Sequence, residues 1–75
     1  MLRLPRITAR KLVRMLCKNL FYIHHITGSH ANLRHKIKDN MRIVVPMHSG
    51  ELAPKTVKTI LVQAEMTVEK LIELL

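Results

Sequence analysis

Histidine is the side chain in this 75-residue sequence best suited to proton transfer, and five are present. His24 and His25 are neighbours in an expected strand, where successive side chains face opposite ways, so the two should not chelate one metal ion together. His30 and His35 lie five positions apart on a second expected strand and also face apart. The pattern therefore predicts no zinc site, and we expect no cofactor.

His30 differs from the other histidines in its context. It directly follows a turn at residues 28–29, and it lies on the strand face opposite Ala31 and Leu33. Arg34 is further along the same face as His30. An exposed imidazole near a guanidinium can transfer a proton beside a phosphate near neutral pH. The spacing also fits an ordinary surface histidine, so the residues alone leave both interpretations open.

Other catalytic patterns are weakly represented. The five acidic residues are dispersed, which disfavours a two-metal site or a paired-acid hydrolase. Gly28 and Gly50 are the only glycines, so the sequence has no Walker loop and no dinucleotide fingerprint. The single cysteine, Cys17, cannot form an internal disulfide, which favours a reducing compartment and a cytoplasmic location.

The charge distribution indicates a polyanionic partner. Thirteen Lys and Arg against five Asp and Glu give a net charge of +8. Residues 1–38 hold nine of the basic side chains and no acidic one, whereas residues 39–75 are close to neutral. Nucleic acid is the commonest partner of such a surface, and an acidic protein or an anionic membrane surface is the alternative.

Length and hydropathy predict one small folded domain over residues 1–75. The composition is 48% hydrophobic, which is typical of a globular domain. No apolar run approaches the roughly 18 residues of a membrane span. The first six residues lack the apolar segment of a secretory signal, so we expect no membrane partner.

Apolar spacing predicts a first helix that begins after an N-cap at Thr8. Arg10, Arg14 and Lys18 recur every four residues and form a basic ridge on its solvent side. Cys17 belongs to the apolar stripe and is expected to be buried. The full stripe comprises Ala9, Leu12, Val13, Leu16, Cys17 and Leu20.

Three strands and two further helices are expected downstream. The strands cover residues 21–27, 30–36 and 42–45, with turns at 28–29 and 38–40, and Pro46 ends the third. Pro54 begins a second helix, and Thr67 is the N-cap of a short last one. The fold class is α+β in the order α-β-β-β-α-α, a three-stranded antiparallel sheet with the helices on one face.

Three ordered sequence blocks cover much of the chain. They are GSHANLRH at 28–35, VVPMH at 44–48 and ELAPKTVKTIL at 51–61, followed by Gln63 and Ala64. They are preceded by Leu4-Pro5 and by TARKLV at 8–13. Together these motifs, over nearly the whole chain, resemble the HicA (YcfA-like) toxin family.

The resemblance implies a compact fold similar to a double-stranded-RNA-binding domain. It further implies the toxin of a type II toxin–antitoxin pair, a metal-independent endoribonuclease that cleaves mRNA (an mRNA interferase). The histidine of the Gly-Ser-His motif, here His30, would be essential, and a HicB-type antitoxin would bind the toxin and cover the site. The toxin is expected as a monomer or in a hetero-oligomer with its antitoxin.

The sequence departs from this family at three places. Many relatives have glycine where this chain has Leu20 and Glu65, and Asn19 is expected to adopt the left-handed conformation that closes the first helix. Relatives often carry basic residues just before Gly28, where this chain has His25-Ile26-Thr27. This difference lowers the phosphate-binding charge beside His30.

A metal-independent route would use the 2′-hydroxyl of the RNA as the nucleophile. His30 would remove its proton or protonate the leaving 5′-oxygen. The candidates for a second acid or base are His48, His24 and Tyr22, and solvent could also serve. The candidate RNA-binding residues are Ser29, Arg34, Lys36, Arg10 and Arg14.

Two other functions are consistent with the same residues. A non-catalytic RNA-binding module of this fold would bind tightly and would not depend on His30. A basic protein-interaction domain would bind an acidic protein and bind RNA weakly.

Overall fold

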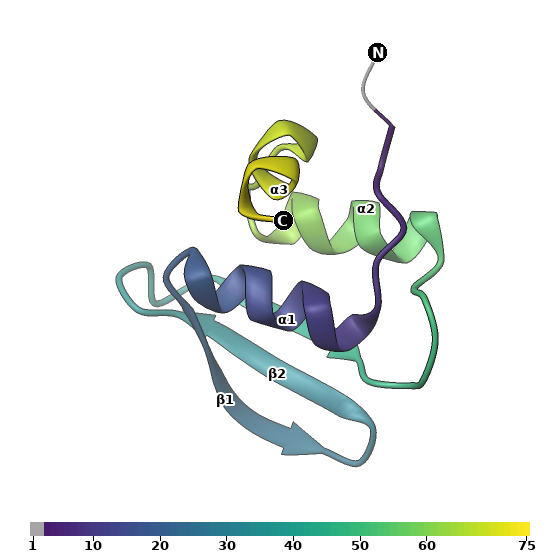
Figure 1. Ribbon diagram of the computed structural model, residues 1–75. Coiled ribbons are helices and arrows are strands. Elements are labelled where there is room, and N and C mark those ends of the chain that lie inside the picture. Colours follow the sequence, from purple (N-terminus) through teal and green to yellow (C-terminus); the bar gives the residue numbers. More distant parts are fainter. Residues whose placement is uncertain (1–2) are drawn as a thin grey trace.

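The computed structural model describes residues 3–75, which form three helices and one antiparallel sheet (Figure 1). The α-β-β-β-α-α order predicted from the sequence is confirmed. The second strand ends one residue earlier than expected and the third ends one residue later. In chain order the elements are α1 (Ala9–Lys18), β1 (Phe21–Thr27), β2 (His30–His35), β3 (Arg42–Pro46), α2 (Pro54–Gln63) and α3 (Val68–Leu74).

The sheet has the order β1-β2-β3, and the helices cover only one of its faces (Figure 1). Ala31 and Leu33 of β2 and Ile43 and Val45 of β3 are buried under the helices. Because side chains alternate along a strand, the residues between them face the other way. That second face of the sheet, which we call the open face, is not covered by any helix of residues 3–75.

The core is entirely apolar within residues 3–75, and no histidine takes part in it. All six elements contribute to it, including α3 through the fully buried Leu71. The polar side chains of the described chain therefore remain at the surface, where they are available for binding or chemistry. The largest buried side chains are Phe21, Ile7, Leu12, Leu16, Leu33, Ile43, Leu71, Val45 and Val57.

Helix α1 confirms most of the predicted stripe, but Cys17 is exposed and its predicted burial is wrong. The Thr8 hydroxyl accepts a hydrogen bond from the Lys11 amide at 3.2 Å and caps the helix as expected. Met15 is buried in place of Cys17, and α3 packs against α1 in addition to the sheet. Leu20 lies beyond the end of the helix and is also exposed.

The residues at the predicted glycine positions adopt the left-handed conformation themselves. Leu20 has φ +72° and Glu65 has φ +53°, whereas Asn19 has φ −111°, so the role expected for Asn19 is wrong. After α2, the Met66 amide donates to the Leu61 carbonyl at 2.9 Å, which closes the helix as a glycine-ended one would be closed.

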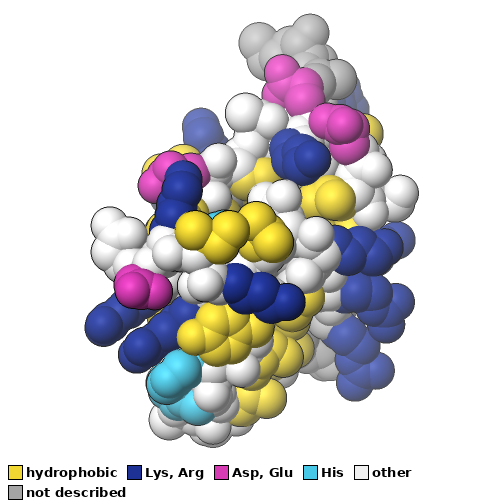
Figure 2. Space-filling view, turned by 90° about the vertical axis from the view of Figure 1, so that its left-hand side faces the viewer, with side chains coloured by type: hydrophobic (Ala, Val, Ile, Leu, Met, Phe, Trp, Pro, Cys, Tyr) yellow, Lys and Arg dark blue, Asp and Glu magenta, His cyan; other side chains and the backbone are white. Residues whose placement is uncertain are grey.

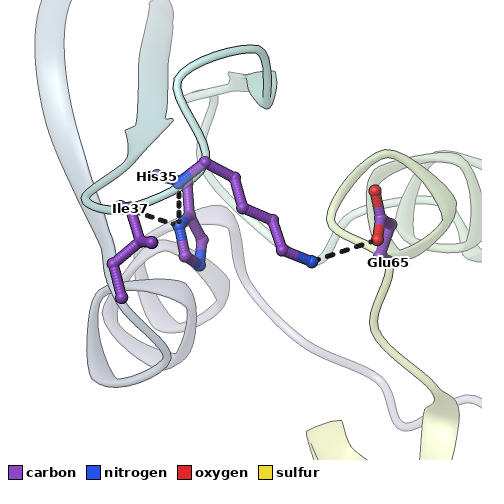
Figure 3. A network of polar contacts seen from close by, with 4 residues as sticks. His35, Ile37 and Glu65 are labelled. Atoms are coloured by element: carbon purple, nitrogen blue, oxygen red, sulfur yellow. Dashed lines mark hydrogen bonds and ion pairs between the residues drawn. The ribbon is translucent and has the colours of Figure 1, made fainter.

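The loop between β2 and β3 is anchored by His35 (Figure 3). The Nδ1 atom of His35 accepts hydrogen bonds from the amides of Ile37 at 3.1 Å and Lys38 at 3.0 Å. Its ring also contacts Phe21 edge-on, with 4.9 Å between centroids. Lys38 then reaches Glu65 at 3.4 Å and links this loop to the end of α2. His35 therefore has a structural role.

Candidate nucleic-acid interface

The β1–β2 hairpin fixes the position of His30. Gly28 has φ +58°, and the pairing of Thr27 with His30 leaves a two-residue loop between the strands. On the other side His30 pairs with Pro46, and the next amide, of Met47, donates to the Ser29 carbonyl. Backbone pairing on both sides therefore holds the residue, while its imidazole is exposed on the open face.

Strand register arranges the open face in three rows that run across the sheet. Arg34 lies four residues from His30 on the same strand and face, which separates their Cα atoms by roughly 13 Å. The rows are Tyr22, Arg34 and Arg42; His25, Asn32 and Val44; and Thr27, His30 and Pro46.

A β-bulge at His24 changes the face that this residue presents. Ile23 pairs with Leu33 and His25 pairs with Asn32, so His24 is an extra residue on β1. The Nδ1 atoms of His24 and His25 lie 2.7 Å apart, and the ring planes cross at 78°. The prediction that the two rings face opposite ways is therefore wrong, because the bulge interrupts the alternation on which it depended.

Positive charge surrounds His24. Removal of water by neighbouring atoms lowers the pKa of His24 below its usual 6.5, and the charges of Arg34, His25 and Arg42 lower it further. The neutral form of His24 is consequently favoured at neutral pH. His25 lies on the open face beside Asn32, and the contact between the two rings places the His24 ring on the same side.

Arg34 and Arg42 are directly opposite each other on neighbouring strands. Within residues 3–75 the ion pairs are Arg6–Glu51 and Lys38–Glu65, so neither arginine has an acidic partner there. Like charges in direct opposition destabilise a sheet. Figure 2 shows histidine side chains next to Lys and Arg side chains at the lower end of the view. This part of the surface is suited to an anion.

The other candidate residues are not all brought together. Tyr22 is on the open face beside Arg34, and Ser29 lies in the turn next to His30. Lys36 lies beyond the opposite end of β2 from His30. Arg14 points away from the buried side of α1. Figure 2 also shows a separate group of Lys and Arg side chains along the right-hand edge of the view.

Arg10 and His48 lie in a separate pocket at the start of α1. The pocket has a volume of about 430 Å³, and it does not include His30. The Nδ1 atom of His48 lies 3.3 Å from the carbonyl oxygen of Ser49. The pocket is lined by Thr8, Ala9, Arg10, Met47, His48, Ser49 and Gly50.

Sequence reasoning missed Arg42 and His25. The alternation of Arg42 with the buried Ile43 could have placed it on the open face. Its pairing with Arg34 depends on strand register, which the sequence pattern did not supply.

Within residues 3–75 no group of three or more His, Cys, Asp or Glu side chains could hold a metal ion. No helix in this range is long and apolar enough to cross a membrane.

The fold and this surface define a small basic α+β domain, in which three helices cover one face of a three-stranded antiparallel sheet. A family model described as the HicA toxin of bacterial toxin–antitoxin matches residues 9–66. The chain therefore belongs to the HicA toxin family, whose members act as toxins with an antitoxin partner. Comparison with curated proteins gives no match. Helix α3 lies outside the matched range, although its Leu71 completes the core.

Proposed function

We propose that this toxin is a metal-independent endoribonuclease that cleaves mRNA with His30 as a general acid or base. The observation that carries the proposal is the exposed ring of His30, held by a two-residue turn on the open face in a chain of the HicA family. An imidazole is suited to this role because it exchanges protons near neutral pH. Ribonucleolytic cleavage would explain how so small a domain acts as a toxin.

The reaction would use the ribose 2′-hydroxyl as the nucleophile. Its oxygen bonds to the adjacent phosphorus, its proton passes to a base, and the bond from phosphorus to the 5′-oxygen breaks. Charge that develops on the phosphate oxygens would be stabilised by Arg34, with Ser29 beside the turn as a further polar contact. Arg10 and Arg14 would not take part, because the sheet separates α1 from the open face.

We propose that a HicB-type antitoxin inhibits the toxin by covering the open face. An inhibitor with acidic groups would match the unpaired positive charge of Arg34 and Arg42. The pair would act in the cytoplasm, where mRNA is the accessible polyanion. The toxin would be a monomer when free and part of a hetero-oligomer when inhibited.

Substitution of His30 by Ala tests the catalytic role. We expect RNA cleavage to fall by about 10²–10⁴-fold with an unchanged free energy of unfolding, because the ring is exposed. His35→Ala is the contrasting variant, because loss of this histidine should destabilise the fold while His30 is retained. Cleavage by wild-type protein should persist in EDTA. A folded His30→Ala variant with full cleavage activity would refute the assignment.

A non-catalytic RNA-binding module is the second candidate, because the open face carries unpaired arginines as well as the histidine. It predicts that the wild-type protein binds RNA and leaves it intact. The same cleavage assay therefore separates the two functions.

A further inference from the structure

His25 occupies the open-face position nearest to His30 that can also exchange a proton. Thr27 pairs directly with His30, and His25 is two residues before Thr27 on the same face. Such diagonal neighbours in an antiparallel pair lie about 7–8 Å apart. A phosphodiester can therefore lie between the two rings, with one imidazole on each side of the phosphorus.

The bulge gives His25 a fixed orientation. Its Nδ1 atom lies 2.7 Å from Nδ1 of His24. At this distance one of the two nitrogens carries a proton and donates it in a hydrogen bond to the lone pair of the other. This contact leaves the Nε2 atom of His25 free. An imidazole with one nitrogen held by a neighbour and the other directed to substrate is the usual arrangement of a catalytic histidine.

The surrounding charges determine which histidine of the pair holds the proton. Removal of water and the charges of Arg34, His25 and Arg42 lower the pKa of His24, which favours a neutral His24 that accepts the shared proton from His25. When His25 donates through Nδ1 to His24, its Nε2 is the nitrogen left to face a substrate. That is the position from which a general acid gives its proton.

We propose that His25 is the general acid of the cleavage reaction, that His30 is its general base, and that His24 positions His25. This inference rests on the proposed ribonuclease function. His30 takes the proton of the 2′-hydroxyl as the 2′-oxygen bonds to phosphorus. The bond from phosphorus to the 5′-oxygen breaks, and His25 gives its Nε2 proton to that oxygen. The products are a 2′,3′-cyclic phosphate and a free 5′-hydroxyl.

The pH dependence of cleavage provides the first test. Wild-type full-length toxin acting on an RNA oligonucleotide should give a bell-shaped pH profile, because the base must be unprotonated and the acid must be protonated. His25→Gln should lower the rate by about 10²–10⁴-fold and remove the alkaline limb. His30→Gln should remove the acidic limb instead.

A substrate with a good leaving group provides the second test. A nucleoside 3′-(4-nitrophenyl phosphate) needs a base but needs no acid, because nitrophenolate leaves without a proton. His25→Gln should cleave it at nearly the wild-type rate, whereas His30→Gln should remain slow. This difference separates loss of an acid from damage to the fold or to binding.

His24 has its own test as a positioning residue. His24→Ala should lower the rate less than His25→Gln, with both limbs of the pH profile retained. His24→Asn, which keeps a hydrogen-bond acceptor near His25, should restore part of the rate. An effect of His24→Ala on stability alone, with an unaltered cleavage rate, would contradict the positioning role.

The outcomes also distinguish this inference from the function on which it rests. If the wild type cleaves RNA and His25→Gln cleaves it equally well, the inference is wrong and the ribonuclease remains. Loss of the alkaline limb in His48→Gln in place of His25→Gln would assign the acid to the pocket at the start of α1. If His25→Gln is equally slow on both substrates, His25 is not an acid. If the wild type cleaves neither substrate, the proposed function itself fails.

Discussion

Replacement of Arg42 by Gln should weaken RNA binding and stabilise the fold at the same time. Arg42 lies directly opposite Arg34, and neither has an acidic partner within residues 3–75. Directly opposed like charges cost about 0.2–1 kcal/mol relative to neutral pairs. Their presence on an exposed sheet face is explained if the two guanidiniums bind a phosphate.

The size of the binding effect follows from counterion release. Each phosphate contact to single-stranded RNA changes the logarithm of the binding constant by about 0.7 per tenfold change in salt. Loss of one contact should therefore lower affinity about fivefold near 0.1 M salt, which corresponds to about 1 kcal/mol. The free energy of unfolding should rise by about 0.2–1 kcal/mol in the same variant.

The assay is fluorescence anisotropy of a labelled single-stranded RNA over a series of salt concentrations. The His30→Gln background prevents cleavage during the measurement, and chemical denaturation gives the stability. Arg14→Gln is the matched control, because it removes the same charge from the solvent side of α1. Equal losses of affinity in Arg14→Gln and Arg42→Gln would refute the placement of RNA on the open face. A less stable Arg42→Gln variant would refute the repulsion argument.

Three further predictions concern the fold. Leu20→Gly should raise the free energy of unfolding by about 0.5–1 kcal/mol in chemical denaturation, because glycine adopts a positive φ without strain. The control is Cys17→Gly inside α1, which should lower the free energy of unfolding by about 1 kcal/mol. His35→Ala should destabilise the protein by about 1–3 kcal/mol, because two backbone amides lose their acceptor, and an unchanged melting temperature would exclude the anchoring role. The folded protein holds the pKa of His24 below the unfolded value of 6.5, so the unfolded state binds more protons and stability should fall as pH drops below 6.5 through the folded pKa. His24→Asn should reduce this acid sensitivity in thermal melts at several pH values, and an identical pH dependence in wild type and variant would contradict it.

The order of the elements and the helix starts at Thr8 and Thr67 could be predicted because each is specified by neighbouring residues. Thr8 and Thr67 both cap their helices through a hydrogen bond from the amide three residues later. The β-branched and aromatic run before Gly28 forms a strand over residues 21–27, as expected. The exposure of His30 also follows from alternation with the buried Ala31 and Leu33.

The errors share a different origin, which is contact between distant segments. Periodicity placed Cys17 in the core, but α1 buries Met15 instead, and the distant α3 packs against α1. Propensity favoured Asn19 for the left-handed position, but Leu20 adopts it, and its carbonyl accepts a hydrogen bond from the Lys36 amide at 2.8 Å. In both places a tertiary interaction outweighed a local preference of about 1 kcal/mol.

The amino-acid sequence by itself determined the helix and strand order, the apolar layer under the helices and the Gly-Ser-His turn, because these depend on periodicity and local hydrogen bonding. Tertiary structure alone decided which surface groups meet. Strand pairing sets Arg34 opposite Arg42, and one extra residue in β1 joins His24 to His25. A bulge forms only when two strands pair, since it is a mismatch in length between them, and a single strand read alone contains no such information.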